Sequence, residues 1–257
     1  MQAAAVRATP LKRLRFIRRP AVLLALAVGQ IPGAGSLADS RVIASGPSRV
    51  HLIELYTSEG CSSCPPAEDW LSRLKKDPAL WRRFVPVAFH VDYWDYLGWP
   101  DPFAAPEWSA RQRAHAARWR VRGVYTPGFV LDGREWRTRV LPRGAPETIG
   151  SLRLEADGDK VRVTFSPAAA PGPHDVYLAR LGSGLVTKVA AGENHGRTLV
   201  HDFVVLSLQK AELPPGETDL ELTLDPLPAH KADALAGWIT PRGSLVPIQA
   251  AGGWLAE

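Results

Sequence analysis

Residues 50–67 read VHLIELYTSEGCSSCPPA, and this stretch gives the strongest indication of the fold. Its first seven residues, 50–56, are apolar and β-branched enough to form a buried strand. A polar turn follows, and Cys61-Ser62-Ser63-Cys64 then stands directly before Pro65-Pro66. Proline is tolerated in the first turn of a helix, where its missing N–H would have had no partner within the helix. The stretch therefore predicts a buried strand, a turn and a helix that begins at the two cysteines.

The segments that follow predict further alternation of strands and helices. Apolar residues 85–91 predict a second strand, residues 107–120 a second helix, and residues 124–131 a third strand. Such alternation is typical of a parallel sheet with helical connections, so we predict an α/β domain over residues 48–142. Beyond that domain period-two patterns dominate, which predicts a smaller all-β, sandwich-like domain over residues 150–257.

The only two cysteines of the chain both lie in the CxxC motif. At the start of a helix, unpaired N–H groups and the helix dipole stabilise a thiolate, which is the nucleophilic form of cysteine. We expect Cys61 to attack a disulfide and Cys64 to resolve the mixed disulfide that forms. An inert disulfide and half of a metal site are the alternatives, although zinc needs two more ligands and the chain has no second CxxC pair.

Two motifs, ELYTSEGCSSCPPA at residues 54–67 and FHVDYWDYLGW at residues 89–99, resemble those of a bacterial family of exported thioredoxin-like proteins of unknown function, the domain of unknown function 1223. Weaker similarity continues at Arg111-Gln112, residues 124–127 and residues 192–199. The resemblance implies a thioredoxin-like fold for the α/β domain and export from the cytoplasm. It supplies no substrate, because the family is itself uncharacterised.

The resemblance also implies roles for two positions outside the CxxC motif. In thioredoxin-like folds a cis-proline lies against the cysteines, and Thr126-Pro127 stands in the matching place, so we expect a cis Pro127 and a substrate-binding backbone at Thr126. Thioredoxins also keep a buried acid that exchanges a proton with the second cysteine, which here implies Glu54 with a raised pKa. The alternative is that Glu54 points outward or pairs with an arginine. Glu59 is nearer in sequence, but we place it on the exposed turn.

The aromatic segment after the second strand leaves the sheet at the edge where parallel sheets place their sites. We expect Tyr93, Trp94 and Trp99 to form either a substrate-binding wall beside Cys61 or a local aromatic core. His195, in a glycine-rich turn, is a candidate for contact between the domains. The remaining histidines outside the motif are expected at the surface or in capping positions, namely His51, His115, His174, His201 and His230.

Residues 1–38 resemble a secretory signal, because basic positions precede a short apolar run and Ser36-Leu37-Ala38 offers small residues for cleavage. An uncleaved anchor is the alternative. The chain carries a formal net charge of +5, but residues 1–38 hold six of its basic residues and no acidic one. Without them 25 basic and 26 acidic residues nearly cancel, so we expect no nucleic-acid partner. We predict a periplasmic or secreted protein with no permanent membrane span after cleavage.

These features favour an exported thiol–disulfide oxidoreductase. We expect it to act on a protein or small-molecule thiol or disulfide, to exchange electrons with an external donor or acceptor, and to need no cofactor. One alternative is a non-enzymatic copper-binding protein or metallochaperone in which Cys61, Cys64 and His90 hold Cu(I), since soft thiolates select that ion. The other is a partner-binding module whose disulfide is inert. The sequence does not give the direction of electron flow.

Overall fold

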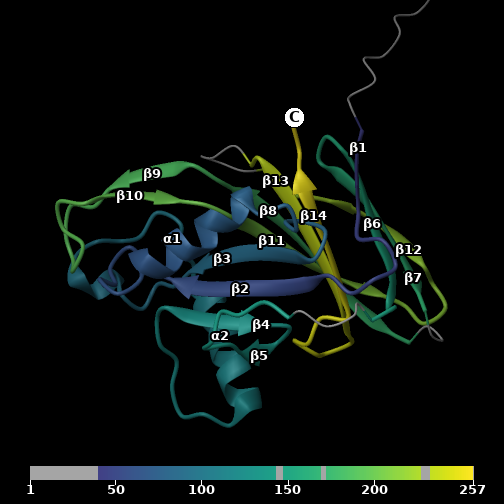
Figure 1. The fold of residues 1–257 in the computed structure, drawn as a ribbon, viewed down its shortest axis with the longest axis horizontal. Coiled ribbons are helices and arrows are strands. Elements are labelled where there is room, and N and C mark those ends of the chain that lie inside the picture. The colour runs from purple at the N-terminus through teal and green to yellow at the C-terminus, as the bar shows by residue number, and fades with distance from the viewer. Residues whose placement is uncertain (1–39, 143–146, 169–171, 227–231, 257) are drawn as a thin grey trace, which may run out of the picture. The chain divides into compact units, whose positions relative to one another are not determined.

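An eight-stranded mixed β-sheet lies at the centre of the computed structural model (Figure 1). Its strands are, from one edge to the other, β14 (Gln249–Trp254), β13 (Ala234–Pro241), β8 (His174–Gly182), β11 (Val204–Leu213), β3 (Phe84–His90), β2 (His51–Thr57), β4 (Gly128–Leu131) and β5 (Arg134–Glu135). β2 runs parallel to β3, and a bridge between Val204 and Ala88 aligns β11 parallel to β3. The other neighbouring pairs of this sheet are antiparallel.

The structure describes residues 40–142, 147–168, 172–226 and 232–256. The predicted signal sequence and His230 lie outside these described residues. Among the helices of the described ranges, none is both long enough and apolar enough to cross a membrane.

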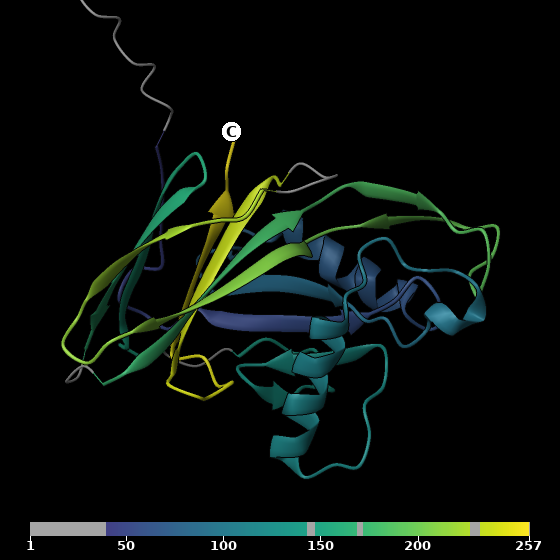
Figure 2. The same cartoon turned by 180° about the vertical axis from the view of Figure 1, so that it is seen from behind.

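A four-stranded antiparallel sheet packs against one end of the central sheet (Figures 1 and 2). Its strands are, in order, β1 (Arg41–Ala44), β6 (Gly150–Asp157), β7 (Lys160–Pro167) and β12 (Asp219–Thr223). Buried and exposed side chains alternate along β6 and β7. The buried ones, among them Leu152, Leu154 and Val163, share a core with Val176 and Leu178 of β8. This alternation is the period-two pattern that predicted strands in this half of the chain.

The helices cover opposite faces of β2. The helical segments are α1 (Pro65–Arg73), the 3₁₀ turn η1 (Leu74–Lys76), the 3₁₀ turn η2 (Asp95–Leu97) and α2 (Pro106–Trp119). Because side chains alternate along a strand, Leu55 packs with Leu71 of α1 in one core, and Tyr56 packs with Trp108 of α2 in another. A strand covered on both faces needs apolar residues in both registers, which explains the nearly uninterrupted apolar run of β2. A two-stranded hairpin, β9 (Leu185–Lys188) and β10 (Thr198–His201), lies beside α1 (Figure 1).

The expected fold class, an α/β thioredoxin-like domain followed by a smaller all-β sandwich-like domain, is wrong. The described chain is mostly β, with 44% strand, 14% helix and only two short α-helices. β11 pairs directly with β3 and brings β8, β13 and β14 into the same sheet, so strands from both sides of the expected boundary share one sheet. This pairing covers the edge that β3 would otherwise expose. The expected third strand, β4, pairs antiparallel with β2 instead of extending a parallel core.

The carboxyl ends of β2, β3 and β10 carry the residues that form the candidate site. β2 ends at Thr57, and the chain then turns toward Cys61. β3 ends at His90 and β10 ends at His201. The ring centroids of these two histidines lie 5.0 Å apart, although 111 positions separate them in the sequence.

Candidate functional site

Cys61 and Cys64 lie on the turn that connects β2 to α1. The backbone N–H of Cys61 donates to the Ser58 carbonyl at 3.1 Å, and that of Cys64 donates to the Cys61 carbonyl at 3.2 Å. Cys64 is the residue that precedes the first helical residue, Pro65. Both cysteines are free thiols, and they are buried, with 1% and 0% of their surfaces exposed. The predicted position of the CxxC motif at a helix start is therefore the observed one.

The two thiols differ strongly in acidity. A hydrogen bond from Cys64 lowers the pKa of Cys61 to about 6, against the opposing effect of burial and with help from the hydroxyls of Ser63 and Thr126. The Cys61 Sγ lies 3.3 Å from the Ser63 Oγ. Burial raises the pKa of Cys64, and so does its hydrogen bond to Cys61. At neutral pH the pair therefore consists of a Cys61 thiolate and a Cys64 thiol.

The loop that contains Thr126 lies against both cysteines. The Thr126–Pro127 peptide bond is cis, as expected from the sequence. The Thr126 hydroxyl interacts with both thiols, and it also accepts a hydrogen bond from the Trp94 indole N–H at 2.8 Å. The structure thus brings together Cys61, Cys64, Thr126 and Trp94, four residues that the sequence singles out.

The aromatic segment contributes differently at each position. Trp94 packs closely on Gly60, where an added Cβ would lie 2.8 Å from the Trp94 Cβ. The Tyr93 hydroxyl donates to the Gln112 side-chain oxygen at 3.1 Å, and burial raises the pKa of Tyr93 to about 12. The Trp99 indole donates to the Glu59 carboxylate at 2.6 Å, which places Trp99 against the turn rather than in solvent. Tyr96, by contrast, is 77% exposed.

A distant loop between β9 and β10 holds the cysteine turn from the other side. The side-chain amide of Asn194 donates to the carbonyls of Glu59 and Cys61, at 2.8 and 2.9 Å. The Glu193 carboxylate accepts hydrogen bonds from the backbone N–H and the hydroxyl of Ser62, at 2.8 and 2.7 Å. Sequence reasoning pointed to His195 in this loop, but the contacts are made by its two neighbours.

A buried carboxylate–histidine cluster, formed by Glu59, Glu68, His90, Asp101 and His201, lies next to the cysteine turn. His201 bridges two carboxylates, with its Nε2 2.8 Å from Glu59 and its Nδ1 2.5 Å from Glu68. Burial lowers the pKa of His201, but the hydrogen bonds and charges of Glu59 and Glu68 prevail and raise it to about 10. Burial raises the pKa of Glu68, but its hydrogen bond and charge interaction with His201 lower it overall.

The cluster touches the thiols through Thr57. The Thr57 hydroxyl hydrogen-bonds to the second oxygen of Glu68, and it also interacts with the Cys64 thiol. His90 completes the cluster, with its Nδ1 2.7 Å from Asp101. Within the described ranges, Glu68, His90 and His201 form the group whose possible metal-ligand atoms all lie within 4.8 Å of one another. The alternative copper ligands, His90 with Cys61 and Cys64, are not brought together in such a group.

Glu54 lies on the opposite face of the sheet from α1. Its carboxylate accepts two hydrogen bonds from the Arg111 guanidinium, at 2.7 and 3.1 Å, and one from the Tyr56 hydroxyl at 2.8 Å. His115 Nε2 lies 3.3 Å away. Burial alone would raise the pKa of Glu54, but Arg111 and His115 hold it well below its ordinary value. The expectation of a raised pKa is wrong, and Glu54 is the arginine-paired carboxylate of the alternative interpretation.

Sequence reasoning missed most of the cluster. Glu59 is fully buried rather than on an exposed turn, and His115, His174 and His201 are buried rather than at the surface. His51 is half-buried, with its Nδ1 2.6 Å from Asp132. Glu68 follows Cys64 by one helical turn, and this spacing alone indicates a carboxylate close to the cysteines. No local pattern connects His201 with the cluster, because 142 positions separate it from Glu59.

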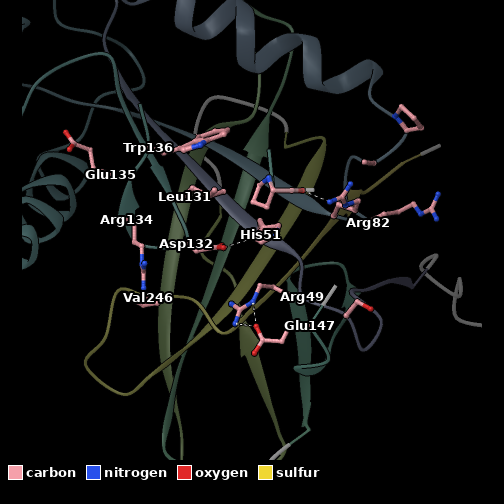
Figure 3. A pocket seen from close by; sticks show the side chains of 15 residues that line it. Arg49, His51, Arg82, Leu131, Asp132, Arg134, Glu135, Trp136, Glu147 and Val246 are labelled. Atoms are coloured by element: carbon pink, nitrogen blue, oxygen red, sulfur yellow. Dashed lines mark hydrogen bonds and ion pairs between the residues drawn. The ribbon is translucent and has the colours of Figure 1, made fainter. Parts of the chain in front are cut away.

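A cavity of about 940 Å³ lies at the opposite end of β2 from Cys61 (Figure 3). Arg49, Arg82 and Arg134 are among its lining residues, and Arg49 pairs with Glu147 at 3.1 Å. None of the lining residues belongs to the cysteine turn or to the carboxylate–histidine cluster. The cavity is therefore separate from the candidate site.

The family expected from the two sequence motifs is confirmed. A family described as proteins of unknown function, DUF1223, matches residues 52–240. None of the curated proteins compared with the chain is significantly similar to it.

Two solved structures share the fold. A crystal structure of a protein from Agrobacterium tumefaciens is 23% identical, with a TM-score of 0.57, and the similarity covers 80% of this chain and 94% of that one. HBP35 of Porphyromonas gingivalis is 15% identical, with a TM-score of 0.52, and the similarity covers 81% of this chain and 76% of that one. Identities this low establish a similarity of fold alone. Because the family match spans most of its length, the chain belongs to the DUF1223 family of proteins of unknown function.

Proposed function

We propose that the protein is a thiol–disulfide oxidoreductase in which Cys61 is the nucleophile and Cys64 the resolving cysteine. The observation that carries the proposal is the difference in acidity between the two thiols. The pKa of Cys61 is lowered to about 6, so this cysteine is ionised at neutral pH, while the pKa of Cys64 is raised and its proton is retained. A catalytic CxxC pair needs this asymmetry, because one sulfur must attack while the other waits as a thiol.

The reaction proceeds in two exchanges. The Cys61 thiolate attacks one sulfur of a substrate disulfide, a Cys61–substrate disulfide forms, and the other substrate sulfur leaves as a thiolate. Cys64 then gives its proton to the departed substrate thiolate or to solvent and attacks the Cys61 Sγ, which forms the Cys61–Cys64 disulfide and releases the second substrate thiolate. Two electrons pass from the protein to the substrate, and both substrate thiolates take up protons according to their own pKa values. The reverse sequence oxidises a dithiol substrate.

Thr126 and Trp94 are the residues best placed to contact a bound substrate. Thr126 interacts with both thiols, Trp94 donates a hydrogen bond to Thr126, and Ser62 and Ser63 form the exposed part of the turn. Since Cys61 itself is only 1% exposed, a protein disulfide reaches it only after a local displacement. The contacts of the β9–β10 loop with the turn are the ones that would open, because the Glu193 carboxylate is held there from an exposed position.

Disulfide exchange suits the expected location outside the cytoplasm, where disulfides form and persist. The copper-binding alternative gains no support from the site, since His90 groups with Glu68 and His201 rather than with Cys61 and Cys64. The alternative of a partner-binding module with an inert disulfide gives no reason for the lowered pKa of Cys61.

Trapping of the mixed disulfide tests the proposal. The Cys64→Ser variant keeps the nucleophile and lacks the resolving sulfur, so incubation with insulin that retains its disulfides should accumulate a covalent adduct at Cys61 that dithiothreitol releases. The Cys61→Ser variant is the matched control, and it should form no adduct because Cys64 is buried and protonated. Equal adduct formation by both variants, or none by either, would contradict the assignment of Cys61.

A further inference from the structure

A second candidate site lies in the carboxylate–histidine cluster, and it does not depend on thiol chemistry. We propose that Glu68, His90 and His201 bind a divalent transition-metal ion of the Zn²⁺ type. The three residues come from α1, from the end of β3 and from the end of β10. All three are buried, and their possible ligand atoms lie within 4.8 Å of one another.

His90 presents the form of imidazole that binds metals. The Asp101 carboxylate accepts a hydrogen bond from the Glu59 backbone N–H at 2.8 Å, and its same oxygen lies 2.7 Å from the His90 Nδ1. A carboxylate accepts hydrogen bonds, so the hydrogen of His90 belongs on Nδ1. The His90 Nε2 is then left with a lone pair, and it is buried without a partner. A metal ion would satisfy this buried lone pair, which lies beside two further potential ligands.

His201 also has a supporting carboxylate, but both of its nitrogens face carboxylates, so its Nδ1 carries a hydrogen that a metal ion would have to replace. Its Nε2 is bonded to the Glu59 carboxylate at 2.8 Å, so its Nδ1 is the nitrogen that faces Glu68 at 2.5 Å. Histidines that bind metals characteristically donate their second ring N–H to a carboxylate, which fixes the ring and raises the basicity of the ligating nitrogen. Two buried histidines that each have such a carboxylate, and that meet at one glutamate, form a donor set with its supporting contacts already in place.

The distances require only a local adjustment. Two ligand atoms about 2.1 Å from a tetrahedral zinc ion are roughly 3.4 Å apart. An ion would therefore take the place of the Nδ1 hydrogen between His201 and Glu68, release that proton to solvent, and draw the His90 Nε2 inward. The second oxygen of Glu68 would keep its hydrogen bond to the Thr57 hydroxyl, so one carboxylate oxygen remains for the ion.

The charges of the cluster also favour a cation. Glu59, Glu68 and Asp101 are three buried carboxylates, and within the described part of the chain no lysine or arginine pairs with any of them. Buried charges need compensation, and exchange of the His201 Nδ1 proton for a doubly charged ion adds one positive charge to that of the histidine. Two imidazoles and one carboxylate are borderline donors that suit Zn²⁺, with a fourth position left for water.

Zinc titration of the full chain that carries Cys61→Ser and Cys64→Ser tests this inference. The two serines remove the thiolates, which would bind zinc by themselves. After removal of metal with a chelator, calorimetry with ZnCl₂ and elemental analysis should show one zinc ion per chain. In the same background, His90→Gln should abolish this binding, and Asp101→Asn should weaken it by about 10–100-fold. His115→Gln is the matched control, because His115 is equally buried and lies near a carboxylate on the other face of the sheet, and it should leave the affinity unchanged.

Absence of stoichiometric zinc in the double-serine chain would overturn the proposal, and so would equal affinity in the folded His90→Gln variant. A second measurement removes any dependence on how these variants fold. Co²⁺ added to the double-serine chain should give the intense visible bands of a four-coordinate nitrogen–oxygen site. The weak spectrum of hydrated six-coordinate Co²⁺ would overturn the assignment. Neither result bears on the exchange reaction of Cys61, because both thiols are absent from this protein.

Discussion

Replacing Cys64 by alanine should raise the pKa of the Cys61 thiol, whereas replacing it by serine should preserve much of the lowered value. The hydrogen bond from Cys64 is the leading cause of the lowered pKa of Cys61. Serine keeps an O–H donor at that position and alanine has none. Each variant retains a single cysteine, so every thiolate signal comes from Cys61.

The size of the effect follows from the site. The surroundings of Cys61 lower its pKa from an ordinary value of 9.0 to about 6. At pH 7 a thiol of pKa 6 is about 90% thiolate, and a thiol of pKa 9 is about 1% thiolate. If the Cys64 hydrogen bond supplies half of the lowering, the thiolate fraction of Cys64→Ala at pH 7 should be about fourfold smaller than that of Cys64→Ser.

Ultraviolet absorbance of the thiolate, followed from pH 4 to pH 10, measures both pKa values directly. Alkylation by iodoacetamide and mass spectrometry of the product verify that the absorbing group is Cys61. We expect a midpoint near 6 for Cys64→Ser and a midpoint displaced toward 9 for Cys64→Ala. A midpoint close to 9 in both variants would show that a hydroxyl donor does not lower the pKa of Cys61. The same low midpoint in both would show that the hydrogen bond from Cys64 is not the cause of the lowering.

Two further predictions concern the contacts around the site. Arg111→Met should destabilise the protein by about 3–5 kcal/mol, because it leaves the buried Glu54 carboxylate without its bidentate partner. In the natural protein the folded-state pKa of Glu54 is lowered, so its contribution is complete above the unfolded-state pKa and is lost as the pH falls through the folded-state pKa. In the variant, burial acts without Arg111 and raises the folded-state pKa of Glu54, so the variant gains stability as the pH falls. The difference between the urea-unfolding free energies of the natural protein and the variant should therefore be smaller at pH 5 than at pH 7. An equal difference at both pH values would contradict this prediction. Asn194→Ala removes the two hydrogen bonds that hold the carbonyls of Glu59 and Cys61, and it should accelerate the reaction of Cys61 with an aromatic disulfide in stopped-flow experiments. An unchanged rate would show that the β9–β10 loop does not limit access.

The local elements of the N-terminal half could be predicted from the sequence. The apolar run at residues 50–56 corresponds to β2 and that at residues 85–91 to β3, each displaced by one residue. Pro65-Pro66 does mark the start of α1, and Thr126-Pro127 has the expected cis bond. These features depend on residues close together in the chain, whose patterns are readable without knowledge of the partner segments.

The arrangement of the strands could not be predicted in this way. A period-two pattern identifies a strand and its buried face, but it does not identify the neighbouring strand. β11 pairs in parallel with β3 through Val204 and Ala88, residues 116 positions apart, and this contact merges the two expected domains into one sheet. The order of strands and helices in the first half does not indicate that β11 from the second half pairs with the edge of β3.

In the candidate site, too, the sequence predicts the residues of short motifs but not the residues that distant segments contribute. The thiols and Thr126 follow from short motifs, whereas the cluster beside them depends on residues that the fold assembles from distant segments. His201 enters with β10, and Asn194 with the loop that precedes it. Glu54 is a carboxylate in a buried strand near the cysteines, and this position favours it as a proton acceptor when the sequence alone is considered. The alternation along β2 directs it to Arg111 on the opposite face, a partner that strand periodicity alone does not reveal.

Equilibration of the Cys61–Cys64 pair with glutathione shows whether the two cysteines exchange electrons as a thiol–disulfide couple. The full chain is equilibrated with defined ratios of reduced and oxidised glutathione, and its thiol and disulfide forms are separated after acid quenching. The account predicts a single reversible two-electron transition between the dithiol and the Cys61–Cys64 disulfide, and no such transition in Cys61→Ser. A pair that stays entirely reduced or entirely oxidised across all ratios, with no exchange over time, would contradict it.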